Sequence, residues 1–396
     1  MESKEVRLGD YIKTNETQYS IKENWENFVY LDTGSIIEGR IDTLLYFTKE
    51  DKLPSRARRK VQHGDIIYSC VRPNQRHYGY INNPVENLLV STGFVVISCK
   101  DIDSKYLYYY LTQDTIINYL QNIGEQSVST YPTIKPQDIE DIFIRIPSDI
   151  EDQRRIASIL SSLVRKIELN NKINADLEEM AQAIFKNWFV DFEPFKDGKF
   201  VDSELGMIPE GWKVGTLEDI AEITMGQSPA GNSLNENREG MIFYQGSSDF
   251  GFRFPSIRVF TTEPKRLAVA NSVLFSVRAP VGDINVAKEE CCIGRGVASI
   301  KSKYGHDSYL FYAMKSLHKL FDSFDGEGTV FGSINKKTLS AIQILLPSDG
   351  IVEQFNNIAS SFDDRIRSLS DENSRLSTLR DTLLPRLMSG ELEVPE

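Results

Sequence analysis

The chain carries one series of short motifs twice, in the same order and about 200 residues apart. Near the start of the series Leu8–Ile12 corresponds to Leu217–Ile220, and at its end Ile146–Asp149 corresponds to Leu346–Asp349. Three further pairs lie between them: 64–73 with 270–280, 106–109 with 309–312, and 134–139 with 334–339. The separation drifts only from 209 to 200 residues, as loop insertions and deletions produce. We therefore interpret the chain as a tandem duplication.

Each repeat divides at a Pro-Ser-Asp sequence, at 147–149 and 347–349. Before it, short runs rich in Val, Ile, Phe and Tyr between Gly, Pro and Asn turns predict strands, interrupted by a modest helix. The strand segments are 65–71, 94–98, 273–277 and 343–346, and the helices are Ser104–Leu120 and Asp307–Phe321. These patterns predict the α+β class, with one strand-rich domain at 1–148 and another at 201–348, each followed by a helical region, at 149–200 and 349–396.

The part after each Pro-Ser-Asp predicts one long helix. Residues 149–188 contain no Pro or Gly, and Ser148 and Asp149 can cap their start. Apolar residues recur every seven positions around a polar Asn layer, and such a helix, roughly 60 Å long at about 1.5 Å per residue, cannot bury its stripe alone. Each helix packs on the other or folds back on its own domain, and the long narrow stripes favour a pair. The pairing positions are Leu160, Ile167, Asn174, Ala181 and Trp188, with Phe362, Leu369, Leu376 and Leu383 in the second helix.

Sequence motifs for catalysis are missing. The chain has no GxxxxGK[ST], GxGxxG, HExxH or GxSxG motif. Its four cysteines lack CxxC spacing and its four histidines are scattered, so we expect no disulfide framework and no metal site. With no run of eighteen apolar residues and no apolar leader, we expect a cytoplasmic protein without a membrane partner. Together these absences favour a non-catalytic chain.

The net charge of −12 argues against nucleic acid, but its distribution does not. Between Lys52 and Arg76 seven basic residues face one acid, which is +6, and between Arg253 and Arg278 five face one, which is +4. A single basic cluster is usually a solvated face. Recurrence at corresponding places in both repeats, beside side chains able to read bases, favours two surfaces for a phosphate backbone.

Amide and guanidinium side chains in these regions are candidates for reading bases, because amides pair with adenine and arginine with guanine. Two polar loops, 127–133 and 329–335, each add one aromatic residue. The candidate DNA-binding residues in the first repeat are Arg56, Arg58, Arg59, Lys60, Arg72, Asn74, Gln75, Arg76 and Tyr131; in the second they are Gln245, Ser247, Ser248, Arg253, Arg258, Lys265, Arg266, Arg278 and Phe331.

Several segments resemble the specificity subunits of type I restriction-modification enzymes. Residues 152–157 lead into Ala183–Phe192 and then into Leu205–Trp212, which is similar to the central conserved region of that family and the start of its second target recognition domain. Leu383–Leu392 is similar to the distal conserved region. The resemblance covers essentially the whole chain, with one departure: the first repeat has no counterpart of Pro209–Trp212.

The resemblance implies two tandem target recognition domains, each reading half of a bipartite double-stranded DNA site. Two long antiparallel coiled-coil helices, related by a pseudo-twofold repeat, would set the gap between the half-sites. It implies as partners two modification (methyltransferase) subunits and the restriction (motor and nuclease) subunits. These subunits would use S-adenosylmethionine, ATP and Mg, with no cofactor on this chain. From the residues alone two alternatives stay open: a fused enzyme, and a coiled-coil scaffold without a nucleic-acid role.

Overall fold

The computed structural model of the chain describes residues 2–126, 131–326 and 332–394. The chain forms two compact units. Unit 1 comprises Met1–Leu169 and Glu372–Glu396, and unit 2 comprises Asn170–Asp371. Each unit therefore contains one strand-rich domain and half of each of two 40-residue helices, α4 (Ile150–Phe189) and α9 (Asp349–Met388). The described part of the chain holds no helix that is both long and apolar enough to cross a membrane.

The described residues of unit 1 form two four-stranded sheets and two strand pairs. The sheet β2-β11-β8-β9 is antiparallel throughout, whereas in the sheet β6-β3-β10-β7 the central pair β3 and β10 is parallel. The strands of the first sheet are β2 (Ile12–Thr14), β8 (Ile66–Ser69), β9 (Tyr78–Tyr80) and β11 (Phe94–Cys99). Those of the second are β3 (Asn27–Leu31), β6 (Leu45–Thr48), β7 (Ala57–Lys60) and β10 (Leu88–Ser91). The pairs are β1 (Ser3–Arg7) with β12 (Phe143–Pro147), and β4 (Ile36–Ile37) with β5 (Arg40–Ile41).

Unit 2 repeats this topology. The sheet β16-β24-β21-β22 is again antiparallel, and in the sheet β17-β19-β18-β23-β20 the pair β18 and β23 is again parallel. The antiparallel sheet has β16 (Ala221–Met225), β21 (Val273–Ser276), β22 (Ile284–Val286) and β24 (Val297–Ser302). The mixed sheet has β17 (Leu234–Asn235), β18 (Met241–Tyr244), β19 (Val259–Thr261), β20 (Leu267–Ala268) and β23 (Cys291–Ile293). The pairs are β15 (Lys213–Thr216) with β25 (Gln343–Leu346), and β13 (Phe200–Val201) with β14 (Ile208–Pro209). This shared strand order confirms the tandem duplication.

Each domain has two short helices where the sequence predicts one. In unit 1 the predicted helix is divided into α1 (Ser104–Leu111) and α2 (Asp114–Glu125) because polar side chains end α1. Thr112 Oγ1 donates to the carbonyl of Tyr109, at 3.0 Å, and the Gln113 amide donates to that of Tyr110, at 3.1 Å. In unit 2, α6 (Asp307–Ser316) and α7 (His318–Gly326) are divided likewise. The remaining short helices are α3 (Pro136–Glu140), α5 (Leu217–Ile220) and α8 (Lys336–Ser340).

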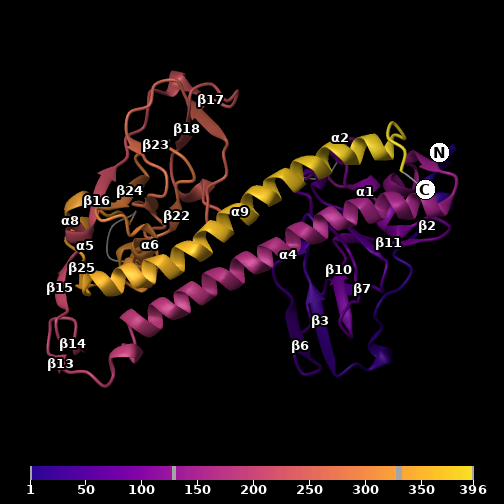
Figure 1. Ribbon diagram of the computed structural model, residues 1–396. Helices are drawn as coiled ribbons and strands as arrows, with labels where there is room; N and C mark the ends of the chain where they lie inside the picture. Colours follow the sequence, from indigo (N-terminus) through magenta and orange to yellow (C-terminus); the bar gives the residue numbers. More distant parts are fainter. Residues whose placement is uncertain (1, 127–130, 327–331, 395–396) are drawn as a thin grey trace. The chain divides into compact units, whose positions relative to one another are not determined.

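The two long helices pair in antiparallel fashion inside each unit (Figure 1). In unit 2 the ring centroids of Phe185 and Phe189 on α4 lie 5.5 and 5.3 Å from that of Phe355 on α9. In unit 1 Lys166 Nζ of α4 lies 3.6 Å from Glu372 Oε2 of α9. Of the nine predicted pairing residues Leu160, Asn174, Ala181 and Leu369 are buried; Ile167, Trp188, Phe362, Leu376 and Leu383 are half-buried.

The heptad pattern drifts along α4. Near its end Phe185 and Phe189 are buried, whereas Ile184 and the predicted pairing residue Trp188 are only half-buried. A straight helix has 3.6 residues per turn, so a seven-residue repeat rotates gradually around its surface. Shifting the buried set by one residue keeps the seam pointed at its partner.

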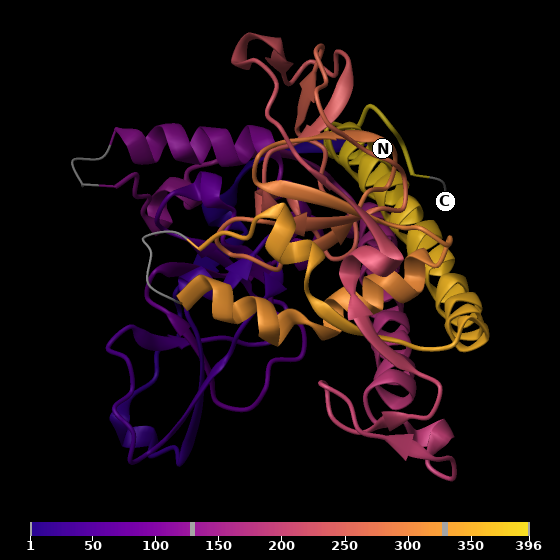
Figure 2. The same cartoon turned by 90° about the vertical axis from the view of Figure 1, so that its left-hand side faces the viewer.

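Aromatic residues close the end of unit 2 where α4 finishes. The rings of Phe192 and Phe195 lie 5.5 and 5.2 Å from that of Trp212, next to the β13–β14 hairpin. In Figure 2 this hairpin projects from the rest of unit 2, and the strands of residues 230–265 form a separate projection away from α6 and α7. The segment between the two repeats, residues 183–212, therefore folds as part of unit 2. The sequence-based division into four regions stays a prediction, since the contacts group each domain with halves of both helices.

Candidate nucleic-acid interface

Strand β7 presents basic side chains at the surface of unit 1. Ala57 is fully buried and the next residue, Arg58, is exposed, as the alternation of a strand requires. Arg56 is exposed just before the strand. Arg58 makes a hydrogen bond from Nε to the carbonyl of Ser55, at 3.2 Å. Arg56 and Arg58 are therefore accessible to a phosphate backbone.

Arg59 has a structural partner within the chain, and its contact with DNA stays a prediction. Its Nη1 donates to Asn15 Oδ1, which also accepts the backbone N–H of Val96 at 3.0 Å. The side chain is half-buried, and this burial lowers the pKa of Arg59. Arg59 thus secures the segment before β3 to strand β11. Its neighbour Lys60 lies 2.7 Å from Glu23 and 5.4 Å from the ring centroid of Trp25, and its DNA contact stays a prediction.

A second candidate surface in unit 1 joins two distant loops. The N–H of Arg72 donates to the carbonyl of Pro132, at 2.9 Å, and a β-bridge links Val71 with Thr133. The guanidinium of Arg72 lies 4.4 Å from the ring centroid of Tyr131, whose side chain is about half exposed. Asn74 and Gln75 follow in the 3-10 turn Pro73–Gln75, and both are exposed. The structure therefore brings together four predicted site residues: Arg72, Asn74, Gln75 and Tyr131.

Arg76 ends the same turn but is already paired. Its Nη2 lies 2.5 Å from Asp114 Oδ1 and its Nε lies 3.5 Å from Glu38 Oε1. Although burial alone would lower it, the pKa of Arg76 is raised by its hydrogen bonds to Asp114 and Tyr78. Arg76 joins the turn to the start of α2, and its contact with DNA stays a prediction.

In unit 2 the candidate surface begins where β18 ends. Gln245 is exposed, and Ser228 Oγ donates to its Oε1 at 3.1 Å. Backbone N–H groups of Gly294 and Gly296 donate to the carbonyls of Tyr244 and Gln245, at 2.8 and 3.1 Å. The turn between those glycines therefore lies against Gln245. The predicted Ser247 and Ser248 follow in a 3-10 turn, Ser247–Asp249, the first half-buried and the second exposed.

Arg295 is a candidate that the sequence reasoning missed. It is exposed at the centre of the Gly294–Gly296 turn, beside Gln245. A Cβ atom on Gly296 would come within 2.6 Å of the Gln245 carbonyl oxygen, so a side chain there is sterically excluded. An arginine between two glycines, flanked by buried strands, is the signal that could have identified it.

The remaining predicted residues of unit 2 lie in different settings. Lys265 and Arg266 are exposed just before β20, and Arg278 is exposed after β21. Arg258 Nε donates to Asp249 Oδ1 at 2.6 Å, so the Arg258 charge is paired with a buried carboxylate. Phe331 lies outside the described residues. These four basic side chains remain predictions for DNA contact.

At the loop junction of the two repeats, Arg278 corresponds to Val71 and not to Arg72. In unit 1 the N–H of Ile134 donates to the carbonyl of Cys70, and in unit 2 that of Ile334 donates to Val277, at 2.8 and 3.0 Å. This pattern matches Arg278 with Val71. The two repeats thus share the junction of these loops but place an arginine at different positions in it.

Arg253 cannot contact DNA, because its side chain is 3% exposed and is enclosed by carboxylates. Its prediction as a DNA-binding residue is therefore wrong. Within the described segments, no group of three or more His, Cys, Asp or Glu side chains is arranged to hold a metal ion.

Comparison with known proteins finds a family that the chain matches. Residues 1–179 and 209–377 match the family described as type I restriction modification DNA specificity domain. The chain is similar to the type I restriction enzyme HindI specificity subunit of Haemophilus influenzae, with 27% identity over 98% of this chain and 99% of that protein. It is similar to a putative MjaX specificity subunit of Methanocaldococcus jannaschii, with 31% identity over 98% and 94%. The crystal structure of a type I restriction-modification system S subunit from M. genitalium has the same fold, with a TM-score of 0.58 at 17% identity, covering 98% of this chain and 96% of that one.

Proposed function

The chain belongs to the type I restriction modification DNA specificity family, and from this membership we propose that its two recognition domains each read one half of a bipartite double-stranded DNA site. As a specificity subunit with two tandem specificity domains, it selects the sequence on which a type I system acts. The helices α4 and α9 serve as the spacer between the half-sites.

The observation that carries this proposal is the repeated loop junction. In unit 1 the carbonyl of Cys70, just after β8, accepts the N–H of Ile134 in the loop before α3. In unit 2 the carbonyl of Val277, just after β21, accepts the N–H of Ile334 in the loop before α8. Unit 1 presents Arg72, Asn74 and Gln75 there, whereas unit 2 presents Arg278. Equivalent supports with different exposed polar residues are what two readers of different base sequences require.

The proposal includes the remainder of a type I system as partners. Two modification subunits would bind the helical regions and methylate adenine with S-adenosylmethionine, and restriction subunits would cleave DNA with ATP and Mg. This chain supplies sequence choice and scaffolding and no catalytic group of its own. The protein would then act in the cytoplasm, where the DNA lies. A coiled-coil scaffold without a nucleic-acid role is not favoured, because both specificity domains match the family.

Equilibrium binding of the assembled complex to a duplex library tests the proposal. The library varies two half-site sequences and the length between them. We expect selection of two fixed half-sites at one spacing, with log K falling linearly as log salt rises. Binding without sequence preference, or without salt dependence, would refute it.

A further inference from the structure

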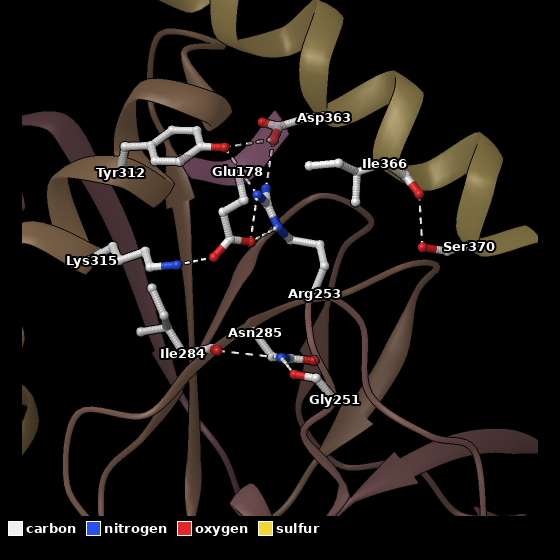
Figure 3. Close-up of polar contacts among 10 residues, drawn as sticks. All are labelled: Glu178, Gly251, Arg253, Ile284, Asn285, Tyr312, Lys315, Asp363, Ile366 and Ser370. Carbon is white, nitrogen blue, oxygen red and sulfur yellow. Dashed lines mark hydrogen bonds and ion pairs between the residues drawn. The ribbon is translucent and has the colours of Figure 1, made fainter. Parts of the chain in front are cut away.

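Arg253 is the centre of a buried ionic cluster in unit 2 (Figure 3). Its Nε and Nη2 donate to Glu178 Oε2 on α4, at 3.2 and 3.0 Å, and its Nη1 donates to Asp363 Oδ1 on α9, at 2.6 Å. Nη2 also donates to the hydroxyl of Tyr312 on α6, at 2.9 Å, and that hydroxyl donates to Asp363 at 3.2 Å. Lys315 of α6 pairs with the second oxygen of Glu178. One side chain of the domain therefore joins both helices.

The loop that carries Arg253 is fixed to the domain. The N–H of Val286 on β22 donates to the carbonyl of Arg253, at 2.9 Å, and the Asn285 amide donates to that of Gly251, at 2.8 Å. The guanidinium of Arg367 on α9 lies over the ring of the next residue, Phe254, 4.9 Å from its centroid. The position of the Arg253 side chain is therefore coupled to the antiparallel sheet of the domain.

The cluster is balanced in charge, and its centre is buried: the side chains of Arg253 and Glu178 are 3% and 10% exposed, whereas those of Asp363 and Lys315 are partly exposed. Two cations, Arg253 and Lys315, meet two carboxylates, Glu178 and Asp363, and the Arg253 guanidinium lies 4.1 Å from the ring centroid of Phe311. A buried pair of this kind adds little net stability over apolar packing, but loss of one partner is severe because the other charge stays buried. Its main effect is to specify one arrangement of the domain on the helices.

Unit 1 has the same framework at the corresponding place. Tyr109 corresponds to Tyr312, and its hydroxyl donates to Ser161 Oγ of α4 at 3.2 Å, as Tyr312 donates to Asp363. The separation of 202 residues that relates Ser161 to Asp363 also relates Glu178 to Arg380. The acid of α4 in unit 2 is therefore an arginine of α9 in unit 1.

The domain side chain that faces Arg380 is also reversed in charge. Glu38 and Arg380 line one cavity of about 600 Å³ in unit 1. Arg380 Nε lies 2.8 Å from Asp381 Oδ1, and Glu38 Oε1 lies 3.5 Å from Arg76 Nε. Although burial alone would lower it, the pKa of Arg380 is raised by the hydrogen bond to Asp381, followed by the charges of Asp381 and Glu38. Glu38 follows the 3-10 turn after β3, and Arg253 follows the 3-10 turn after β18, the equivalent strand. Unit 2 thus places a domain cation against two carboxylates of the long helices, and unit 1 places a domain anion in a cavity that an arginine of α9 also lines.

We propose that Arg253 and Glu38 are positioning residues that seat the two recognition domains on the helices with opposite charge polarity. Each domain matches in charge the helix surface of its own unit. Exchanging the two domains would place Arg253 against Arg380, and Glu38 against Glu178 and Asp363. Arg253 contributes to half-site reading by holding its domain at one angle to α4 and α9, without touching DNA. The effect on DNA rests on the proposed function; the charge matching does not.

Charge exchange in the full chain tests the proposal. Arg253→Glu sets an acid against Glu178 and Asp363, so we expect a lower urea midpoint for unit 2, reported by Trp188 and Trp212. The fourfold variant Arg253→Glu, Glu178→Arg, Lys315→Thr and Asp363→Ser gives unit 2 the residues of unit 1, and we expect it to recover most of that loss. Lys319→Glu, an equal charge change at an exposed site on α7, is the matched control and should leave the midpoint unchanged.

The duplex library supplies a readout that a purely stabilising role would not move. We expect Arg253→Glu to lower selectivity for the second half-site or its spacing by about tenfold, equivalent to about 1.4 kcal/mol, while base preference at the first half-site is retained. If that variant does not fold, Arg253→Met removes the charge without adding repulsion and gives the same comparison. Wild-type selectivity and midpoint in the single variant, or no recovery in the fourfold variant, would overturn the proposal. If the wild-type complex selects no bipartite site, the proposed function fails, and the midpoints still decide the charge matching.

Discussion

Replacing both Arg56 and Arg58 by Ala removes two exposed guanidinium groups from the β7 surface of unit 1. Neither is part of a buried network, so the change in the free energy of unfolding should stay within about 0.5 kcal/mol. The expected effect lies in DNA affinity, because each phosphate contact releases counterions when the complex forms.

The magnitude follows from the number of contacts. Each phosphate contact contributes about 0.9 to the slope of log K against log salt, so loss of two should reduce the slope by about 1.8. If the two lines meet near 1 M salt, the affinity at 0.1 M falls roughly 60-fold. Fluorescence anisotropy with a labelled cognate duplex between about 50 and 200 mM salt measures both quantities.

Two variants separate contact from folding. Lys172→Ala removes an exposed charge on α4 and should leave the slope unchanged. Arg59→Ala should instead lower the free energy of unfolding by about 1.5–3 kcal/mol, because its charged hydrogen bond to Asn15 is lost. An unchanged slope in the Arg56 and Arg58 double variant would show that this surface does not contact phosphates, and the assignment of β7 would be abandoned.

Three other perturbations address the helices and the caps. Phe355→Ala should cost unit 2 about 3–5 kcal/mol by urea unfolding, since Phe355 is fully buried among aromatic rings; a loss no larger than that of the exposed Phe143→Ala would contradict the pairing of α4 with α9. Four residues inserted near Asn174 add about 6 Å of helix, or roughly two base pairs at 3.4 Å each, so the recognised gap should lengthen or be lost; altered half-site sequences would refute the spacer role. The backbone N–H of Thr216 donates to the Asp219 carboxylate and lowers the pKa of that carboxyl. The stability that Asp219 contributes is therefore complete above the pKa of the unfolded state and is lost as the pH falls through the lower pKa of the folded state. Asp219→Asn should flatten this acid dependence of the unfolding free energy, and an unchanged profile would exclude this cap as its source.

Secondary structure was largely predictable because its signals are local. Strand β25 occupies the predicted residues 343–346, and α4 begins at Ile150, one residue from the predicted start. Asp149 accepts the N–H of Glu151, at 2.9 Å, as a cap should. The division of the predicted helix at Thr112 was missed because its cause is a pair of side-chain bonds to carbonyls, which apolar periodicity does not register.

The candidate site was only partly predictable. Arg56 and Arg58 are exposed, yet Arg59, Arg76 and Arg253 bind other side chains of the chain. A basic residue near base-reading amides has the same composition signal in either setting. Its environment depends on which distant residues the fold brings to it.

The sequence by itself determined the duplication, the two long helices and the family, because these depend on the order and period of residues along the chain. Only the tertiary structure decided which cations are available to DNA. Arg253 meets Glu178 from 75 positions before it and Asp363 from 110 positions after it. A guanidinium binds a carboxylate as readily as a phosphate, so its role is decided by which anion the fold places beside it.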